Sequence, residues 1–101
     1  SEEIFKLGRM IISRKRIEEN NNNNINIMKF HFKNNLDKKI FSNDDKRESE
    51  ALKQPAIKKA VDDLRDYHYE TMFLELEYEH KLRLFNIWEV KKIIIKNGFE
   101  N

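Results

Sequence analysis

The chain has 101 residues, of which 39% are hydrophobic and 38% are charged, and its formal net charge at pH 7 is +2. This length fits one small domain or a fragment of a larger one, with little apolar material for a core. The near-neutral charge excludes the strongly basic signature of many nucleic-acid-binding proteins, and the lack of cysteine excludes disulfides and thiolate metal sites. We expect an intracellular, reducing compartment, most simply the cytoplasm, and no membrane span.

Residues 2–19 predict an amphipathic N-terminal helix. Ile4, Leu7 and Ile11 recur at helical spacing, so one face of this stretch is apolar. The densest basic cluster of the chain follows. It gives a first set of candidate phosphate contacts, with a solvated helix face as the alternative interpretation: Arg14, Lys15 and Arg16.

The middle of the chain predicts irregular and extended structure. The asparagine run at residues 20–24 is typical of a flexible linker or a loop tip. Residues 25–32 alternate in polarity, and residues 37–41 could form a return strand, so a small β-hairpin over about 25–41 is an option. Residues 42–50 are polar and charged and predict a loop that could include the first turn of the next helix.

The stretch from Pro55 to Gly98 contains no proline or glycine between its two ends, which predicts a long helix. Pro55 suits the first helical turn, and Asn97 with Gly98 suits the stop. We expect one long amphipathic helix or a bent helix pair over about 49–97, with the bend near residues 69–71. The fold class is therefore mainly α. Residues 61–79 hold seven acids and one base, and residues 80–96 hold five bases and one acid.

The second half of this helix carries more apolar surface than a single exposed helix needs, which favours contact with a protein partner. The candidate interface residues are Tyr78, Leu82, Phe85, Trp88, Ile93 and Ile95. The basic end of the same helix gives a second set of candidate phosphate contacts, formed by Lys91, Lys92 and Lys96.

No motif in the sequence predicts a catalytic, cofactor or metal site. Two glycines in the whole chain cannot build a phosphate-binding loop. A nuclease of the Asp…(Asp/Glu)-x-Lys type needs carboxylates on adjoining strand ends; Asp37-Lys38-Lys39 follows the predicted strand, and Glu18 or Glu19 would be the upstream acid.

One stretch resembles a known family. Residues 51–64 read Ala-Leu-Lys-Gln-Pro-Ala-Ile-Lys-Lys-Ala-Val-Asp-Asp-Leu, and a Tyr-Glu pair follows at Tyr78. This pattern is similar to the C-terminal helical region of PD-(D/E)XK nuclease family transposases, the recombination-promoting nuclease group, over about residues 51–101. Residues 98–101 would begin that family's tail of spaced Gly and Glu, while Asn86 stands near the place of an expected aspartate.

The resemblance implies a truncated or degenerate member of that family, and no catalytic residue is carried over. We therefore expect a non-catalytic helical module for protein–protein interaction or assembly, whose partner is another protein or a second copy of the chain. The alternative is a nucleic-acid-binding accessory protein that uses the basic clusters. A second alternative is a Mg²⁺-dependent nuclease completed by a partner chain, with Asp37 and Lys39 as its contribution.

Overall fold

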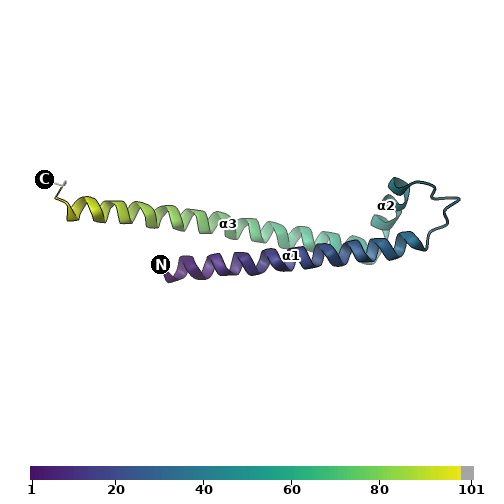
Figure 1. The fold of residues 1–101 in the computed structure, drawn as a ribbon, viewed down its shortest axis with the longest axis horizontal. Helices are drawn as coiled ribbons and strands as arrows, with labels where there is room; N and C mark the ends of the chain where they lie inside the picture. Colours follow the sequence, from purple (N-terminus) through teal and green to yellow (C-terminus); the bar gives the residue numbers. More distant parts are fainter. Residues whose placement is uncertain (99–101) are drawn as a thin grey trace. The chain divides into compact units, whose positions relative to one another are not determined.

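The computed structural model describes residues 1–98, which form three helices: α1 (Glu2–Asn34), α2 (Asp44–Lys53) and α3 (Pro55–Lys96) (Figure 1). The expected mainly α fold is confirmed. The β-hairpin considered over residues 25–41 is wrong, because residues 25–34 complete α1 and no strand occurs among residues 1–98. Its period-two alternation is short, whereas Ile25, Met28 and Phe32 have helical spacing and point their apolar side chains to one side.

Helix α1 continues through the asparagine run, so the predicted helix end near residue 19 and the flexible tract at residues 20–24 are both corrected. Asparagine costs at most about 0.7 kcal/mol per residue relative to alanine in a helix. The flanking segments hold the run in place, because Leu7 and Ile11 before it and Ile25 after it are buried. Packing of an amphipathic face outweighs such local preferences.

Helix α2 occupies most of residues 42–50, so the polar loop is wrong from Asp44 onward and the other option, the start of the next helix, is what the structure has. Asn43 caps this helix, since its side-chain oxygen accepts a hydrogen bond from the Lys46 N–H at 2.8 Å. Acidic Asp44 and Asp45 follow in the first turn, where the helix dipole favours them. Capping asparagine and acidic residues at this place are a helix-start signal, although the surrounding composition is typical of a loop.

Helix α3 begins and ends where the sequence predicts. Pro55 occupies its first position, and the preceding Gln54 is extended (φ −65°, ψ 129°), as a residue before proline prefers. The helix ends at Lys96, and Gly98 has a positive φ of 73°. Of the two options over about 49–97, one long helix or a bent helix pair, the structure has a pair, α2 and α3, which separate at Gln54. Helix α3 is continuous through residues 69–71, and the bend expected there stays a prediction.

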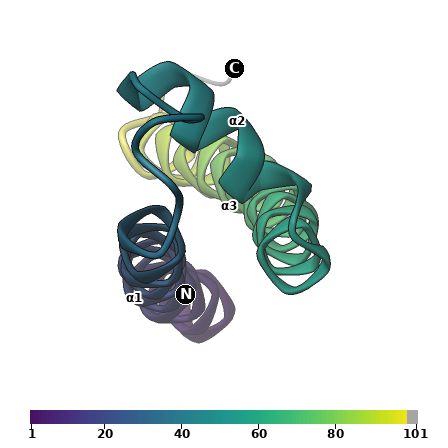
Figure 2. The same ribbon diagram turned by 90° about the vertical axis from the view of Figure 1, so that its right-hand side faces the viewer.

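Contacts divide the chain into two compact units. The terminal unit contains Ser1–Arg14 and the chain from Glu70 onward, and the central unit contains Lys15–Tyr69. In each unit a segment of α1 lies beside a segment of α3, and α2 belongs to the central unit (Figure 2). Each core is thin. Leu7 and Ile11 are the buried hydrophobic residues of the terminal unit, and Ile25, Ala51 and Ile57 those of the central unit.

Candidate interaction surface

Helices α1 and α3 approach closely in the terminal unit. A Cβ added at Gly8 would lie 3.3 Å from Cε2 of Tyr78, so the ring occupies the space that a larger residue on α1 would need. Thr71 lies on the face of α3 that contacts α1, and it is only 1% exposed. Tyr78, Leu82 and Phe85 of the predicted interface are half-buried on this face. The neighbouring Met72 is 44% exposed, so Thr71 and not Met72 lies on the inward face.

Arg14 is held against α3. Its Nε donates to Oγ1 of Thr71 at 2.9 Å, and a terminal guanidinium nitrogen donates to Oε2 of Glu70 at 3.1 Å. The Arg14 side chain is only 19% exposed, whereas Lys15 and Arg16 are exposed. The three residues of the predicted phosphate-binding cluster therefore do not present one common basic surface.

An ion pair between Lys81 of α3 and Glu3 of α1 lies near the start of α1. Lys81 also contacts Glu77 at 3.2 Å. The hydrogen bond from Lys81 lowers the pKa of the Glu3 carboxyl, and the same bond raises the pKa of Lys81. Helix α3 continues for fifteen residues beyond Lys81, to Lys96, which is about 22 Å at 1.5 Å per residue.

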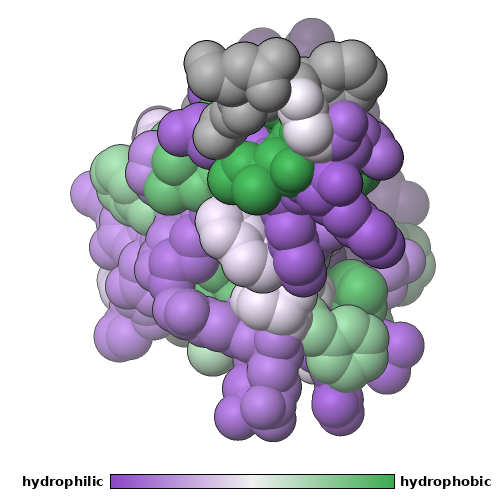
Figure 3. Space-filling view, turned by 90° about the vertical axis from the view of Figure 1, so that its left-hand side faces the viewer, coloured by the Kyte–Doolittle hydropathy of each residue, from purple (hydrophilic) through white to green (hydrophobic). Residues whose placement is uncertain are grey.

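Exposed apolar side chains concentrate on α3. Of the nineteen large hydrophobic residues that are exposed among residues 1–98, eleven lie between Tyr69 and Ile95. In Figure 3, which views the side that carries the two chain ends, patches of hydrophobic residues interrupt the hydrophilic surface. We call the following set the apolar end of α3: Leu84, Ile87, Trp88, Val90, Ile93, Ile94 and Ile95.

Three of the predicted interface residues belong to the apolar end of α3. Trp88 is 54%, Ile93 56% and Ile95 59% exposed. The Trp88 ring centroid lies 6.2 Å from that of Phe85, and Nζ of Lys92 lies 4.7 Å above the indole. The interface predicted from the sequence did not include Leu84, Ile87, Val90 and Ile94. Their three- and four-residue spacing is visible in the sequence, but only as a second stripe beside the inward one.

The basic side chains at the end of α3 do not form one surface with the basic cluster around Arg14. Lys91, Lys92 and Lys96 are all exposed. Arg14 contacts Thr71, and Lys96 lies 25 residues further along α3, about 37 Å away along the helix axis. The two predicted sets of phosphate contacts are therefore separate surfaces.

The residues of the nuclease hypothesis lie in the turn after α1. The Lys39 N–H donates to Oδ1 of Asp37 at 2.9 Å, and both residues are exposed. Within the described residues there is no strand end of the kind that the hypothesis requires, and helix α1 runs to Asn34. Within residues 1–98, no group of three or more His, Asp or Glu side chains is arranged to hold a metal ion.

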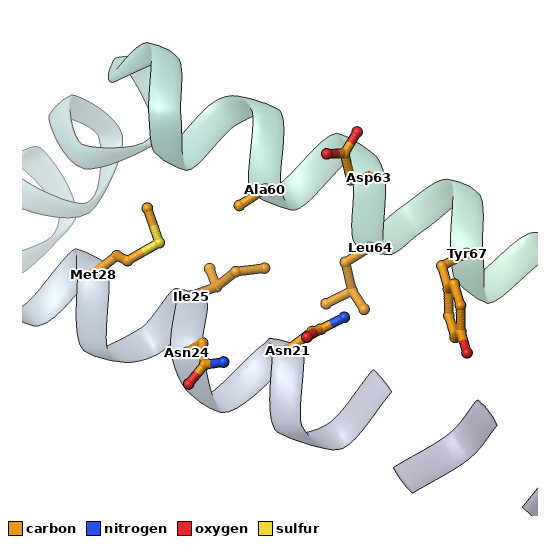
Figure 4. Close-up of a pocket in the computed structure, with 8 residues that line it drawn as sticks. All are labelled: Asn21, Asn24, Ile25, Met28, Ala60, Asp63, Leu64 and Tyr67. Carbon is orange, nitrogen blue, oxygen red and sulfur yellow. The ribbon is translucent and has the colours of Figure 1, made fainter. Parts of the chain in front are cut away.

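The central unit contains a cavity of about 310 Å³ between α1 and α3 (Figure 4). Ile25 and Leu64 face each other across it, and Asp63 points away from α1. Asp63 also pairs with Lys59 at 2.7 Å. A ligand pocket of this size normally has several polar groups that converge on one point. Here the other polar lining is Asn21, Asn24 and the Tyr67 hydroxyl, so we assign it no ligand.

Glu48 of α2 links that helix to α1 within the central unit. It accepts a hydrogen bond from Nζ of Lys29 at 2.7 Å and a second from Nζ of Lys33. These bonds, the one from Lys29 first, hold the pKa of the Glu48 carboxyl below its ordinary value of 4.5. Lys33 also approaches Asp44 at 3.6 Å. The cluster is an ion-pair network that fastens α2.

Comparison of the chain with protein-family models, with curated proteins and with solved structures finds no match. The resemblance of residues 51–101 to the transposase family therefore stays a prediction, and its proposed tail at residues 98–101 lies largely outside the described residues. Among the described helices, none is both long enough and apolar enough to cross a membrane.

Proposed function

We propose that this chain is a helical protein–protein interaction module, and that the apolar end of α3 is the surface that receives the partner. The observation that carries the proposal is the row of exposed large hydrophobic residues on the part of α3 beyond Lys81. Contiguous apolar patches on a protein surface mark interaction sites, because their burial releases about 25 cal/mol per Å².

A helix is the partner element that fits this surface best. The apolar end of α3 is a regular helix, and two such helices pack by fitting side chains of one into the grooves of the other. Trp88 adds a large aromatic anchor, of the kind that dominates many interfaces. The ammonium group of Lys92, which lies over the Trp88 ring, places a positive charge at the edge of the apolar residues.

Photo-crosslinking tests the proposal. A photoreactive amino acid replaces Ile94 in the full chain, and a matched variant carries it at Lys58, an exposed polar position of the same helix. Both variants are irradiated as purified protein and in cells of the source organism. We expect a discrete protein adduct of Ile94 and none of Lys58, whether the adduct is a second copy of the chain or another protein.

Equal or absent crosslinking at the two positions in both settings would overturn the proposal. A companion variant, Leu84→Gln with Ile87→Gln and Val90→Gln, is expected to abolish the adduct. Because all three residues are exposed, this variant should keep its helical circular dichroism, and that measurement separates loss of binding from loss of folding.

Nucleic-acid binding is the second candidate, supported by the three exposed lysines in the last turns of α3. It is weaker, because Arg14 is already engaged by Thr71 and Glu70. It predicts a DNA or RNA shift that decreases steeply with salt and is lost in a Lys91→Gln, Lys92→Gln, Lys96→Gln variant. Descent from a nuclease-type transposase is a proposal about origin, supported only by residues 51–64 and Tyr78-Glu79.

A further inference from the structure

Helix α3 carries a second apolar stripe on the face opposite α1. The stripe that faces α1 contains Thr71, Tyr78 and Leu82. Two residues along a helix correspond to a rotation of about 200°, so Phe73 lies on the far side from Thr71. We call the far row the outer stripe. Its members are each between 48% and 72% exposed, apart from Ile94 at 36%: Phe73, Leu76, Leu84, Ile87, Val90 and Ile94.

Five of the six residues of the outer stripe follow a seven-residue repeat, and Leu84 flanks it. Phe73, Ile87 and Ile94 fall on one position of the repeat, and Leu76 and Val90 fall on the other, three residues later. His80 and Arg83 fill the two remaining places. Three heptads of this pattern are the minimum that is typical of a coiled-coil seam. Because its members are exposed, the outer stripe is open to another helix.

The charges beside the outer stripe are self-complementary only in one orientation. Glu77 flanks its first half and Lys91 flanks its second half, both on the same side of the seam. The wider sequence agrees, because acids dominate residues 61–79 and bases dominate residues 80–96. Two copies of α3 in parallel would place like charges side by side, whereas two antiparallel copies place the acidic half of each against the basic half of the other.

We propose that the outer stripe binds the outer stripe of a second copy of this chain, antiparallel and related by a two-fold axis near residue 85. This inference rests on the proposed function and names its partner. In this register Leu76 faces Ile94 of the second copy, and Ile94 faces its Leu76. The same register sets Glu77 beside Lys91 of the second copy, twice by symmetry, and Leu84 beside its own symmetry mate.

The two polar residues within the outer stripe fit this register. His80 faces Val90 of the second copy, and Arg83 faces Ile87. The long aliphatic stem of an arginine can cover an apolar neighbour while its guanidinium stays in water. Polar residues at single seam positions cost stability but select one register over its neighbours.

Cysteine trapping tests orientation and register together, and the chain contains no native cysteine to interfere. Leu76→Cys and Ile94→Cys are made separately and oxidised gently, alone and as an equimolar mixture. In the proposed dimer, the two copies of residue 76 lie 18 helical positions apart, about 27 Å, and so do the two copies of residue 94. A disulfide needs Cα atoms within about 7 Å. We therefore expect a disulfide dimer from the mixture and none from either variant alone.

Disulfide dimers of each variant alone, with none favoured in the mixture, would show a parallel pair and overturn the inference. A monomeric mass for the unmodified chain by light scattering up to about 1 mM, with no disulfide in any sample, would overturn it too. The proposed function can hold even if this inference fails. An Ile94 crosslink to a different protein would support the proposed function and would exclude a second copy as the partner.

Charge reversal gives an independent test that leaves the apolar residues intact. Glu77→Lys and Lys91→Glu are each expected to weaken the dimer by about tenfold, because each change sets two like-charge pairs across the seam. The double variant, Glu77→Lys with Lys91→Glu, restores opposite charges and should recover most of the affinity in sedimentation equilibrium. Glu77 also contacts Lys81 within α3, and circular dichroism of the single variants controls for that loss. A double variant as weak as the single variants would count against the register.

Discussion

At the scale of single residues, Gly8 decides how closely α1 and α3 approach in the terminal unit. Gly8→Leu would place a branched side chain where the Tyr78 ring lies, since even a Cβ would be 3.3 Å from Cε2. We expect this change to lower the free energy of unfolding by about 1–3 kcal/mol, as overpacking commonly does. Urea denaturation followed by circular dichroism measures it.

Gly8→Ala is the matched control. Alanine gains about 1 kcal/mol of helix propensity over glycine, and a small shift of the half-buried Tyr78 ring relieves its contact. We expect the alanine variant to stay within about 1 kcal/mol of the parent. If the leucine variant unfolds at the same urea concentration as the parent, the packing of Gly8 against Tyr78 is contradicted.

Helical periodicity predicts some of the inward-facing residues of α1 and α3 but not all of them. The spacing of Ile4, Leu7 and Ile11 correctly predicts the inward face of α1. It cannot predict that Thr71 is buried in place of Met72, because that depends on the hydrogen bond from Arg14, a residue 57 positions away. Long-range polar partners leave no periodic signal in a single sequence.

At the scale of elements, the continuity of α1 through its asparagine run can be tested directly. Asn22 and Asn23 are exposed within the helix, so Asn22→Ala with Asn23→Ala should raise stability by about 1 kcal/mol in total. Asn22→Gly with Asn23→Gly should lower it. Thermal unfolding monitored at 222 nm measures both, and an identical midpoint for the two variants would mean that the run is not helical in solution.

A second element-scale prediction concerns pH and the attachment of α2. The pKa of Glu48 is lowered by hydrogen bonds from Lys29 and then Lys33, so its contribution is complete above the ordinary carboxyl value and is lost as pH falls through the lower folded value. Glu48→Gln should therefore cost about 0.5–1 kcal/mol at pH 7. The difference from the parent should shrink once pH falls below 4.5 and disappear after pH has passed through the lowered folded pKa of Glu48.

Lys59→Gln is a useful control for the Glu48 prediction, because it removes an ion pair inside α3 that does not involve α2. A difference between Glu48→Gln and the parent that stays constant from pH 7 to pH 3 would contradict the proposed network.

The boundaries of the elements were predictable where a residue fixes the backbone. Pro55 and Gly98 mark the two ends of the α3 region correctly, because proline suits a first helical turn and glycine tolerates a positive φ. Asparagine composition and a short alternating stretch mark residues 20–32 incorrectly. Those signals are weak local preferences, and the burial of Ile25 overrides them.

At the scale of the whole molecule, the thin cores predict that stability depends on concentration. Only five hydrophobic residues among residues 1–98 are buried, whereas the outer stripe alone exposes six. If a second copy covers that stripe, unfolding is coupled to dissociation, and the thermal midpoint should fall by a few degrees with each tenfold dilution. Calorimetry at three concentrations measures this dependence; a midpoint that does not change would contradict obligate pairing.

The proposed interaction surface was only partly predictable from the sequence. Its general place on the second half of α3 follows from the apolar composition there, and Trp88, Ile93 and Ile95 are exposed as an interface requires. The separation of α3 into an inward and an outer stripe depends on which face α1 covers. The sequence of one helix does not show which of its faces packs against a neighbouring helix. The close approach of Gly8 on α1 to Tyr78 on α3 identifies that face in the structure.

Trp88 is the single tryptophan of the chain, and it lies on the apolar end of α3 with Lys92 above its ring. Its fluorescence therefore originates from that end of the helix alone. Emission near 350 nm and quenching by iodide would describe a solvated indole, and the nearby ammonium group should draw the anionic quencher toward the ring. Trp88 is thus an intrinsic fluorescence probe. A blue shift of its emission maximum during a titration would report partner binding without any added label.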